Sequence, residues 1–261
     1  MGILNATPDS FYAESRANEE HDTKRRVTQI LADGAQIIDI GAYSTRPGAQ
    51  QVSLDDEWQR LEKALKVARD VAPDAIISVD TFRREIARRS VSEYAVDIIN
   101  DVSGGNLDKK MPETVAKLGV PYVLMHMQGD PTTMQSLCNY TSVVSDVREY
   151  LLSKAKHLKQ MGINDVIIDP GFGFSKTIEQ NYELLNRLES ITESDFPVLV
   201  GLSRKSMAYK PLGITPQDAL NATTALHTIA LLKGAAILRV HDVKAAVEAI
   251  KIVALTQQVN N

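Results

Sequence analysis

The stretch Val166-Ile-Ile-Asp-Pro-Gly-Phe-Gly-Phe174 joins an apolar run of strand length to a loop of polar and turn-forming residues. The apolar run is typical of a buried strand, and Asp169 ends it. Pro170, Gly171 and Gly173 then interrupt the strand pattern. A buried strand that stops at a carboxylate and opens into a glycine-containing loop predicts a ligand site at the end of that strand.

The same unit recurs along the chain. Seven other apolar runs precede loop and helix-like sequence, at residues 1–5, 37–40, 76–79, 97–100, 121–125, 198–200 and 236–239. Apolar residues at helical spacing, such as Leu61 and Leu65 after the capping residue Ser53, predict amphipathic helices between the runs. Thr215 and Pro216 likewise predict the N-cap and the first position of a helix that extends to about residue 233.

Apolar strands separated by helices indicate a parallel sheet that is covered on its outer face. About eight such repeats, with no linker between them, predict an α/β protein with a single (β/α)8 TIM barrel, in preference to an open doubly wound sheet. The 261 residues would form one domain, since this length is ordinary for such a barrel. Met1 already lies inside the first expected strand, which raises the alternative that the chain is trimmed at its start.

Composition and charge restrict the classes of partner that the protein can bind. The formal charge of −4 gives no general attraction to nucleic acid or to an anionic membrane, so an anionic ligand must be held by local cations. No apolar run approaches the roughly 18 residues of a membrane span, and no signal peptide is visible. The single cysteine, Cys138, cannot form an intramolecular disulfide, which favours a cytoplasmic protein.

The active site of such a barrel lies at the carboxyl ends of its strands. The residues expected at this mouth combine cations with carboxylates and amides: Asn5, Thr45, Arg46, Asp80, Asn100, Asp101, His126, Asp169, Lys205, Arg239 and His241. Cations suit a phosphate-like group, whereas carboxylates and amides suit a flat heterocycle with many hydrogen-bonding groups. Met125, at the end of the fifth run, is expected to line the pocket.

Each group also has a structural interpretation. Arg46 and Arg239 could form ion pairs at the rim, and His241 could cap a helix. Asp169 and Lys205 could form a structural ion pair across the barrel, because a buried carboxylate needs a partner. No clustered set of ligands predicts a metal site made by protein alone, so we expect Mg²⁺ to be held by substrate phosphates and the Asn5 amide.

Seven short motifs, in chain order, resemble the motif set of the dihydropteroate synthase family along essentially the whole chain. They are Asn5-Ala-Thr-Pro-Asp-Ser-Phe11, Ser44-Thr-Arg-Pro-Gly48, Ser78-Val-Asp-Thr81, Ile99-Asn-Asp-Val102, Asp169-Pro-Gly-Phe-Gly-Phe174, Ser203-Arg-Lys-Ser206 and Arg239-Val-His-Asp242. The resemblance implies a transferase of folate biosynthesis. Such enzymes condense 6-hydroxymethyl-7,8-dihydropterin pyrophosphate with p-aminobenzoate and release 7,8-dihydropteroate and pyrophosphate. It also implies a homodimer, and sulfonamides as competitors of p-aminobenzoate.

The same resemblance assigns residues by motif. The residues implied to hold the pterin are Asp80, Asn100, Asp169, Lys205 and Arg239. Those implied to hold the pyrophosphate are Thr45, Arg46, Arg239 and His241, with magnesium at Asn5. Those implied to border the p-aminobenzoate pocket are Pro47, Phe174, Lys205 and Ser206. Catalysis is assigned to Asp80, Lys205 and Arg239.

Two loops depart from the family pattern. Residues 10–15 read Ser-Phe-Tyr-Ala-Glu-Ser where the family usually has Ser-Phe-Ser-Asp-Gly-Gly, and Tyr43 replaces a usual glutamate. These departures concern loop closure and the amine pocket rather than the pterin pocket. Two alternatives therefore remain: a homologue with impaired catalysis, and a folate-binding module that supplies methyl groups to a corrinoid partner.

Overall fold

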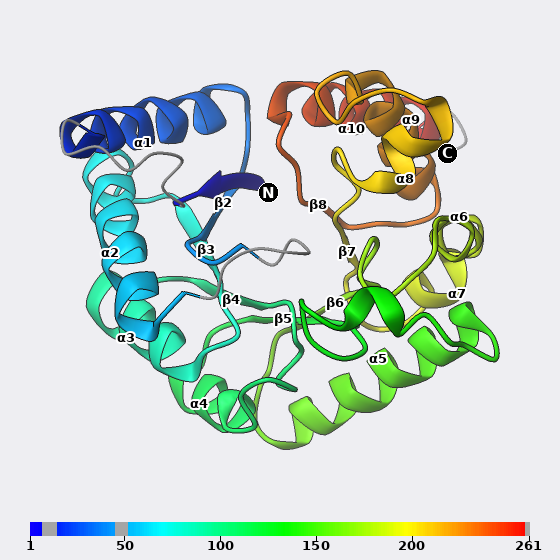
Figure 1. Cartoon of the computed structure of the whole chain (residues 1–261), viewed down its shortest axis with the longest axis horizontal. Helices are drawn as coiled ribbons and strands as arrows, with labels where there is room; N and C mark the ends of the chain where they lie inside the picture. Colours follow the sequence, from blue (N-terminus) through cyan, green and yellow to red (C-terminus); the bar gives the residue numbers. More distant parts are fainter. Residues whose placement is uncertain (7–14, 45–51, 259–261) are drawn as a thin grey trace.

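The structure is a computed structural model that describes residues 1–6, 15–44 and 52–258 (Figure 1). Its strands are β1 (Gly2–Asn5), β2 (Ile37–Gly41), β3 (Ile76–Asp80), β4 (Ile98–Asp101), β5 (Tyr122–Met125), β6 (Val166–Asp169), β7 (Leu199–Val200) and β8 (Ile237–Leu238). Their order follows the eight apolar runs of the sequence, with bounds that differ by one or two residues.

The strands close into a parallel barrel. Strands β1 to β6 pair in sequence order, and β7 pairs with β8. Parallel bridges from Ile168 to Val198 and from Gly2 to Val240 join the two sheets at both edges. The amide of Ile3 donates to the carbonyl of Val240 at 2.9 Å, so the first and last strands meet. The prediction of a (β/α)8 barrel is confirmed.

Helices surround the strands in Figure 1. They are α1 (Ser15–Ala32), α2 (Leu54–Val71), α3 (Arg84–Tyr94), α4 (Met111–Leu118), α5 (Val143–Gln160), α6 (Ile178–Asn186), α7 (Glu189–Thr192), α8 (Ser206–Tyr209), α9 (Leu220–Leu232) and α10 (Val243–Gln258), with 3-10 turns η1 (Met134–Ser136) and η2 (Lys210–Leu212). Ser53 caps α2 as predicted, because its Oγ accepts from the amide of Asp56 at 3.1 Å. Within the described ranges, the helices lack the combination of length and apolar content that a membrane crossing requires.

One predicted helix start is wrong. The helix expected from Thr215 begins only at Leu220, and the preceding residues form a turn. The Arg204 guanidinium takes up the carbonyls of Pro216 and Gln217, at 2.8 and 2.6 Å. The Pro216 carbonyl also accepts from the Ala219 amide three residues later, as in a turn rather than an α-helix, and Arg204 holds both carbonyls in this arrangement.

The base of the barrel interior is apolar. Ile98, Val123, Ile167 and Leu199 form a buried cluster, against which Met1, Ile37 and Ile237 also pack. These residues come from different strands at alternating positions, so they point inward and fill the barrel. We call this set the apolar floor. The functional groups lie above it, toward the carboxyl ends of the strands.

Candidate active site

A polar layer lies directly above the apolar floor. Because side chains alternate along a strand, residues two positions beyond the floor also point into the barrel. These residues are Asp39, Asn100, Met125, Asp169 and Arg239. Asp80 belongs to the same layer, because it lies directly opposite Asn100 in the β3–β4 pair. The polar members come from opposite ends of the sequence and meet in one interior.

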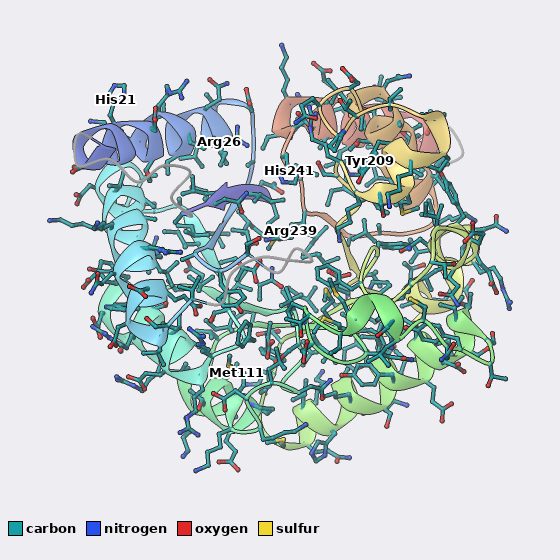
Figure 2. The ribbon with its side chains drawn as sticks, viewed as in Figure 1. His21, Arg26, Met111, Tyr209, Arg239 and His241 are labelled. Atoms are coloured by element: carbon teal, nitrogen blue, oxygen red, sulfur yellow. The ribbon has the colours of Figure 1, made fainter. Side chains whose placement is uncertain are left out.

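Arg239 lies inside the barrel (Figure 2). Its Nε donates to Asp39 Oδ2 at 2.6 Å, and its Nη2 donates to Asp80 Oδ2 at 2.7 Å. Asp39 is fully buried, whereas the Asp80 side chain retains 14% exposure at the mouth. Two carboxylates from neighbouring strands therefore share one guanidinium. This cluster of Asp39, Asp80 and Arg239 is called the arginine clamp below.

Asp39 is absent from the residues predicted for the site. Its signal is present in the sequence, as a carboxylate in the middle of the apolar run 37–40 and two residues after the floor residue Ile37. A charged residue on the inward face of a buried strand needs a partner. That partner, Arg239, lies 200 residues away in the sequence, so local pattern could not identify it.

Asp39 also contacts the predicted ligand residue Asn100. The Asn100 Nδ2 lies 3.3 Å from Asp39 Oδ2, which directs the amide hydrogens toward the clamp. The amide oxygen then faces away from Asp39 and can accept a hydrogen bond. Asn100 is buried and lies next to Asp80 across the β3–β4 pair.

Burial and the neighbouring charges shift the pKa values of Asp80 and Arg239 in the arginine clamp. Burial raises the pKa of Asp80 to about 7, opposed by the nearby Arg239 charge and reinforced by the Asp39 carboxylate. Burial alone would lower the pKa of Arg239, but the Asp39 and Asp80 carboxylates raise it above its ordinary value. Two carboxylates that share one cation carry one excess negative charge, so a proton or a ligand N–H group is favoured at Asp80.

Asp169 and Lys205 lie on the other side of the mouth. Burial raises the pKa of Asp169, whose Oδ1 accepts from the Gly171 amide at 2.7 Å. Burial lowers the pKa of Lys205 to about 8, and its Nζ donates to the Phe172 carbonyl. The same Nζ lies 4.6 Å from the centre of the Phe174 ring. An ammonium, a carboxylate and an aromatic face are thus placed around one loop.

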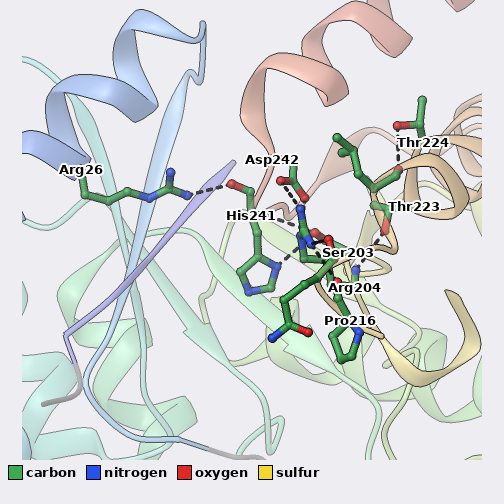
Figure 3. Close-up of polar contacts among 10 residues, drawn as sticks. Arg26, Ser203, Arg204, Pro216, Thr223, Thr224, His241 and Asp242 are labelled. Carbon is green, nitrogen blue, oxygen red and sulfur yellow. Dashed lines mark hydrogen bonds and ion pairs between the residues drawn. The ribbon is translucent and has the colours of Figure 1, made fainter. Parts of the chain in front are cut away.

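The last two strand loops meet at His241 (Figure 3). Ser203 Oγ lies 3.1 Å from His241 Nδ1, and the His241 carbonyl accepts from Arg26 of α1 at 2.8 Å. Arg204 binds Asp242 through two contacts of 2.8 Å, although its own backbone has the left-handed φ of 55°. This bidentate pair holds the loop after β7 against the loop after β8.

The other predicted residues lie as follows. Met125 is buried in an apolar cluster with Val102, Met127 and Met134, against which Phe82 and Phe174 pack. Asn5 is exposed at the end of β1, and Ser206 begins α8 directly after Lys205. Thr45, Arg46 and Pro47 lie outside the described residues, as does most of the altered first loop. The roles of all these residues stay predictions.

The described part of the chain holds no cluster of three or more His, Cys, Asp or Glu side chains arranged for a metal ion. Two carboxylates of the polar layer, Asp39 and Asp80, are bound to Arg239. The exposed Asn5 offers an amide oxygen, a ligand type that Mg²⁺ accepts. This donor set fits a metal that arrives with substrate phosphates.

Comparisons with known proteins agree with this geometry. Residues 1–241 match the family described as "Pterin binding enzyme". The chain is 41% identical over 260 residues to dihydropteroate synthase of Escherichia coli K12, covering 98% of this chain and 90% of that protein. In structure it resembles dihydropteroate synthase of Thermus thermophilus in complex with 4-aminobenzoate, with a TM-score of 0.86 and 36% identity, covering 98% and 93% of the two chains.

A second solved structure is equally similar. The dihydropteroate synthase of Yersinia pestis, in a sulfonamide drug complex, gives a TM-score of 0.88 and 37% identity, again covering 98% of this chain and 93% of the other. Identity at this level over nearly the full length, together with the closed barrel and the layer at its mouth, settles the family. This chain belongs to the pterin-binding enzyme family, among the dihydropteroate synthases.

Proposed function

We propose that this chain condenses 6-hydroxymethyl-7,8-dihydropterin pyrophosphate with p-aminobenzoate, giving 7,8-dihydropteroate and pyrophosphate. The observation that carries the proposal is the polar layer, in which Asp80, Asn100 and Asp169 converge on one barrel interior beside Lys205 and Arg239. This set offers acceptors and donors for the edges of a flat ring, and cations for a diphosphate.

The pterin ring would lie above the apolar floor. Asp80 and Asp169 would accept N–H groups of the ring, and the Asn100 oxygen would accept a further one. Lys205 would donate to a ring acceptor in addition to the Phe172 carbonyl. Buried carboxylates are costly without partners, so ring N–H groups would offset a desolvation that the free protein already bears.

In the reaction, the amine nitrogen of p-aminobenzoate forms a bond to the exocyclic methylene carbon, and the bond from that carbon to the pyrophosphate oxygen breaks. The amine then loses a proton. Arg239 and His241 would stabilise the charge on the departing pyrophosphate, with Thr45 and Arg46 assisting from the second loop. The electron-rich pterin, together with Asp80 in its ionised form, would stabilise positive charge on the methylene carbon.

Mg²⁺, held by the Asn5 amide and pyrophosphate oxygens, would supply neutralisation of the leaving-group charge. Phe174, Lys205, Ser206 and Pro47 would hold p-aminobenzoate in line with the carbon, so that positioning supplies much of the acceleration. Sulfonamides would compete for this pocket, as the Yersinia pestis complex suggests.

A homodimer and a cytoplasmic location belong to the proposal. Helices α9 and α10 pack against each other (Figure 1). They expose apolar side chains: Leu220, Ile229, Leu232, Ile250, Ile252 and Leu255. Such a patch suits a protein interface. If it is the dimer face, Ile252→Lys should shift the sedimentation coefficient to that of a monomer; an unchanged dimer would exclude this face.

The decisive experiment measures pyrophosphate release with both substrates, with each substrate omitted in turn, and with Mg²⁺ removed by chelator. Release should require both organic substrates, and Arg239→Ala should abolish it. Calorimetry should show that Asp169→Ala and Lys205→Ala lose affinity for the pterin pyrophosphate. Binding of methyltetrahydrofolate without pyrophosphate release would instead indicate the methyl-transfer module, and no release at all would indicate a barrel without catalysis.

A further inference from the structure

The loop after β6 is folded tightly against the end of β5. Gly171 and Gly173 have φ angles of 70° and 80°, which side-chain-bearing residues rarely adopt. A Cβ at Gly171 would lie 2.1 Å from the His126 carbonyl oxygen, so the backbones of the two loops touch. The Gly173 amide is fixed by Asn181 Oδ1 at 2.7 Å.

The centre of this loop is filled by Lys176, a residue that sequence analysis did not single out. Its Nζ donates to the carbonyls of Gly171 and Phe174, both at 3.0 Å, and lies 3.2 Å from His126 Nδ1. Only 4% of the residue is exposed. Burial lowers the pKa of His126 to about 3, so its ring is neutral. Burial also lowers the pKa of Lys176 to about 7, opposed by the nearby Asp169 carboxylate. In the protonated form of Lys176, the two carbonyls and His126 Nδ1 accept all three of its N–H donors.

The same short loop carries the groups that face the mouth. Its first amide, at Gly171, donates to Asp169, and its Phe172 carbonyl accepts from Lys205. The Phe174 ring lies under the Lys205 ammonium. Lys176 Nζ contacts the carbonyls of Gly171 and Phe174, which flank Phe172 in the loop. Because its donors are directed at these carbonyls and at His126, it would act on a ligand through the loop and not by direct contact.

We propose that Lys176 is a positioning residue for the reaction: by drawing the carbonyls of Gly171 and Phe174 onto one buried ammonium, it fixes the loop that sets Phe174 and Lys205 against p-aminobenzoate. The inference rests on the proposed function and names a residue that acts through others. Phe174 is bound to Lys176 directly through its carbonyl, whereas Asp169 is reached only through Gly171. The affinity for p-aminobenzoate should therefore suffer more than the affinity for the pterin.

The test compares Lys176→Met and Lys176→Gln with the parent protein. Methionine keeps the length of the lysine carbon chain and removes every donor; glutamine offers two N–H donors for three acceptors. Steady-state kinetics should show kcat/KM for p-aminobenzoate reduced on the order of tenfold to a hundredfold in Lys176→Met, the scale of a misplacement of about 1 Å. Most of this loss should lie in KM. Lys176→Gln should lose less. The KM for the pterin pyrophosphate should rise less than the KM for p-aminobenzoate in both variants.

A second readout is independent of turnover. Hydrogen exchange of the amides at residues 171, 173 and 174 should accelerate in both variants. The matched control is Lys154→Met, because Lys154 is also partly buried and donates to Asn106 Oδ1 and the Tyr150 hydroxyl. Tyr150 packs edge-on against the His126 ring, so this control also shows what a disturbance beside His126 does while the Lys176 contacts to the loop carbonyls are kept. The control should lose stability without a change in KM or in exchange of the loop.

The outcomes separate the two proposals. A parent protein that makes no dihydropteroate contradicts the proposed function itself. An active parent whose folded Lys176→Gln variant retains the parental KM for p-aminobenzoate and the parental loop exchange overturns the role of Lys176. A KM rise equal to that in Lys154→Met also overturns it, because the effect would then be general destabilisation. If Lys176→Met does not fold, Lys176→Gln decides.

Discussion

The apolar floor and the polar layer stand on the same strands, two residues apart, and face the same interior. At the floor, Ile98, Val123 and Leu199 pack without hydrogen-bonding groups in their side chains. One step higher, Asp39 and Asn100 are as deeply buried but polar. Burying apolar area stabilises a fold, whereas burying charge costs free energy unless partners compensate.

The difference separates two tasks of one barrel. The floor closes the barrel and could be replaced by other apolar residues of similar volume. The polar layer should contribute little net stability, because the cost of removing its charges from water offsets the attraction between them. Its residues instead provide charges and hydrogen-bonding groups for a ligand. The following predictions are ordered from the largest expected effect to the smallest. They test whether a substitution in the floor changes stability alone and whether a substitution in the polar layer changes ligand binding.

The largest effect is expected for Arg239→Ala. It leaves Asp39 and Asp80 without their cation, and breaking such a buried pair costs about 3–5 kcal/mol. Chemical denaturation should show a loss of this order, and pyrophosphate release should disappear. Asp39→Asn combined with Arg239→Ala should recover part of the stability and none of the activity. If the single variant were as stable as the parent, the clamp would not be an interacting unit.

Leu199→Ala should affect only the floor. Truncation of a fully buried leucine costs about 2–5 kcal/mol, because it removes apolar contacts and leaves a cavity. The denaturation midpoint should fall, while KM for both substrates stays within about twofold of the parent value, since the ligand groups lie one layer above. A large rise in either KM at a temperature where the variant is folded would show that the layers are coupled.

The polar layer should also make stability depend on pH. The pKa of Asp80 is raised to about 7 by burial in the folded protein, against about 4 in an unfolded chain. Between these values the folded state binds the additional proton, so stability should fall as pH rises from about 4 to about 7. Denaturation curves across this window should show a steeper decline in the parent than in Asp80→Asn. Equal slopes would contradict the shift.

Binding of the pterin pyrophosphate should also depend on pH, through the protonation states of Asp80 and Lys205. If ionised Asp80 accepts ring N–H groups, kcat/KM for the pterin pyrophosphate should rise as pH approaches about 7. It should decline above about 8, where Lys205, whose pKa burial lowers, loses its charge. A profile that stays flat from pH 6 to about pH 9 would remove both residues from binding in these protonation states.

The smallest effect is expected outside both layers, for Thr177→Ala. Thr177 and Gln180 form a capping box at the start of α6, directly after Lys176. Removing such a cap costs about 0.5–2 kcal/mol. Thermal unfolding should shift by a few degrees, with kcat almost unchanged. A change in kcat larger than threefold would extend the ligand-positioning region into α6.

Sequence predicted the parts of this molecule that depend on neighbours in the chain. Apolar runs located the strands, and Asp169 with its glycine loop located one side of the mouth, because strand ends carry their signal locally. Positions after the apolar runs also placed Asn100 and Lys205 at the mouth, and the family motifs assigned them roles. Sequence reasoning missed Asp39 and Lys176, whose roles depend on Arg239 and His126 in other loops. The error at Thr215 has the same cause, since Arg204 holds the carbonyls of the turn that precedes α9.

The bridge between Gly2 and Val240 has a consequence for synthesis. The barrel closes where β1 meets the segment after β8, and Arg239 is adjacent to that contact. Synthesis proceeds from β1 to β8, so the strands that carry Asp39 and Asp80 are made before the cation that these carboxylates share. The ligand-binding layer can therefore be completed only when β8 joins the barrel, in one late step of folding rather than gradually.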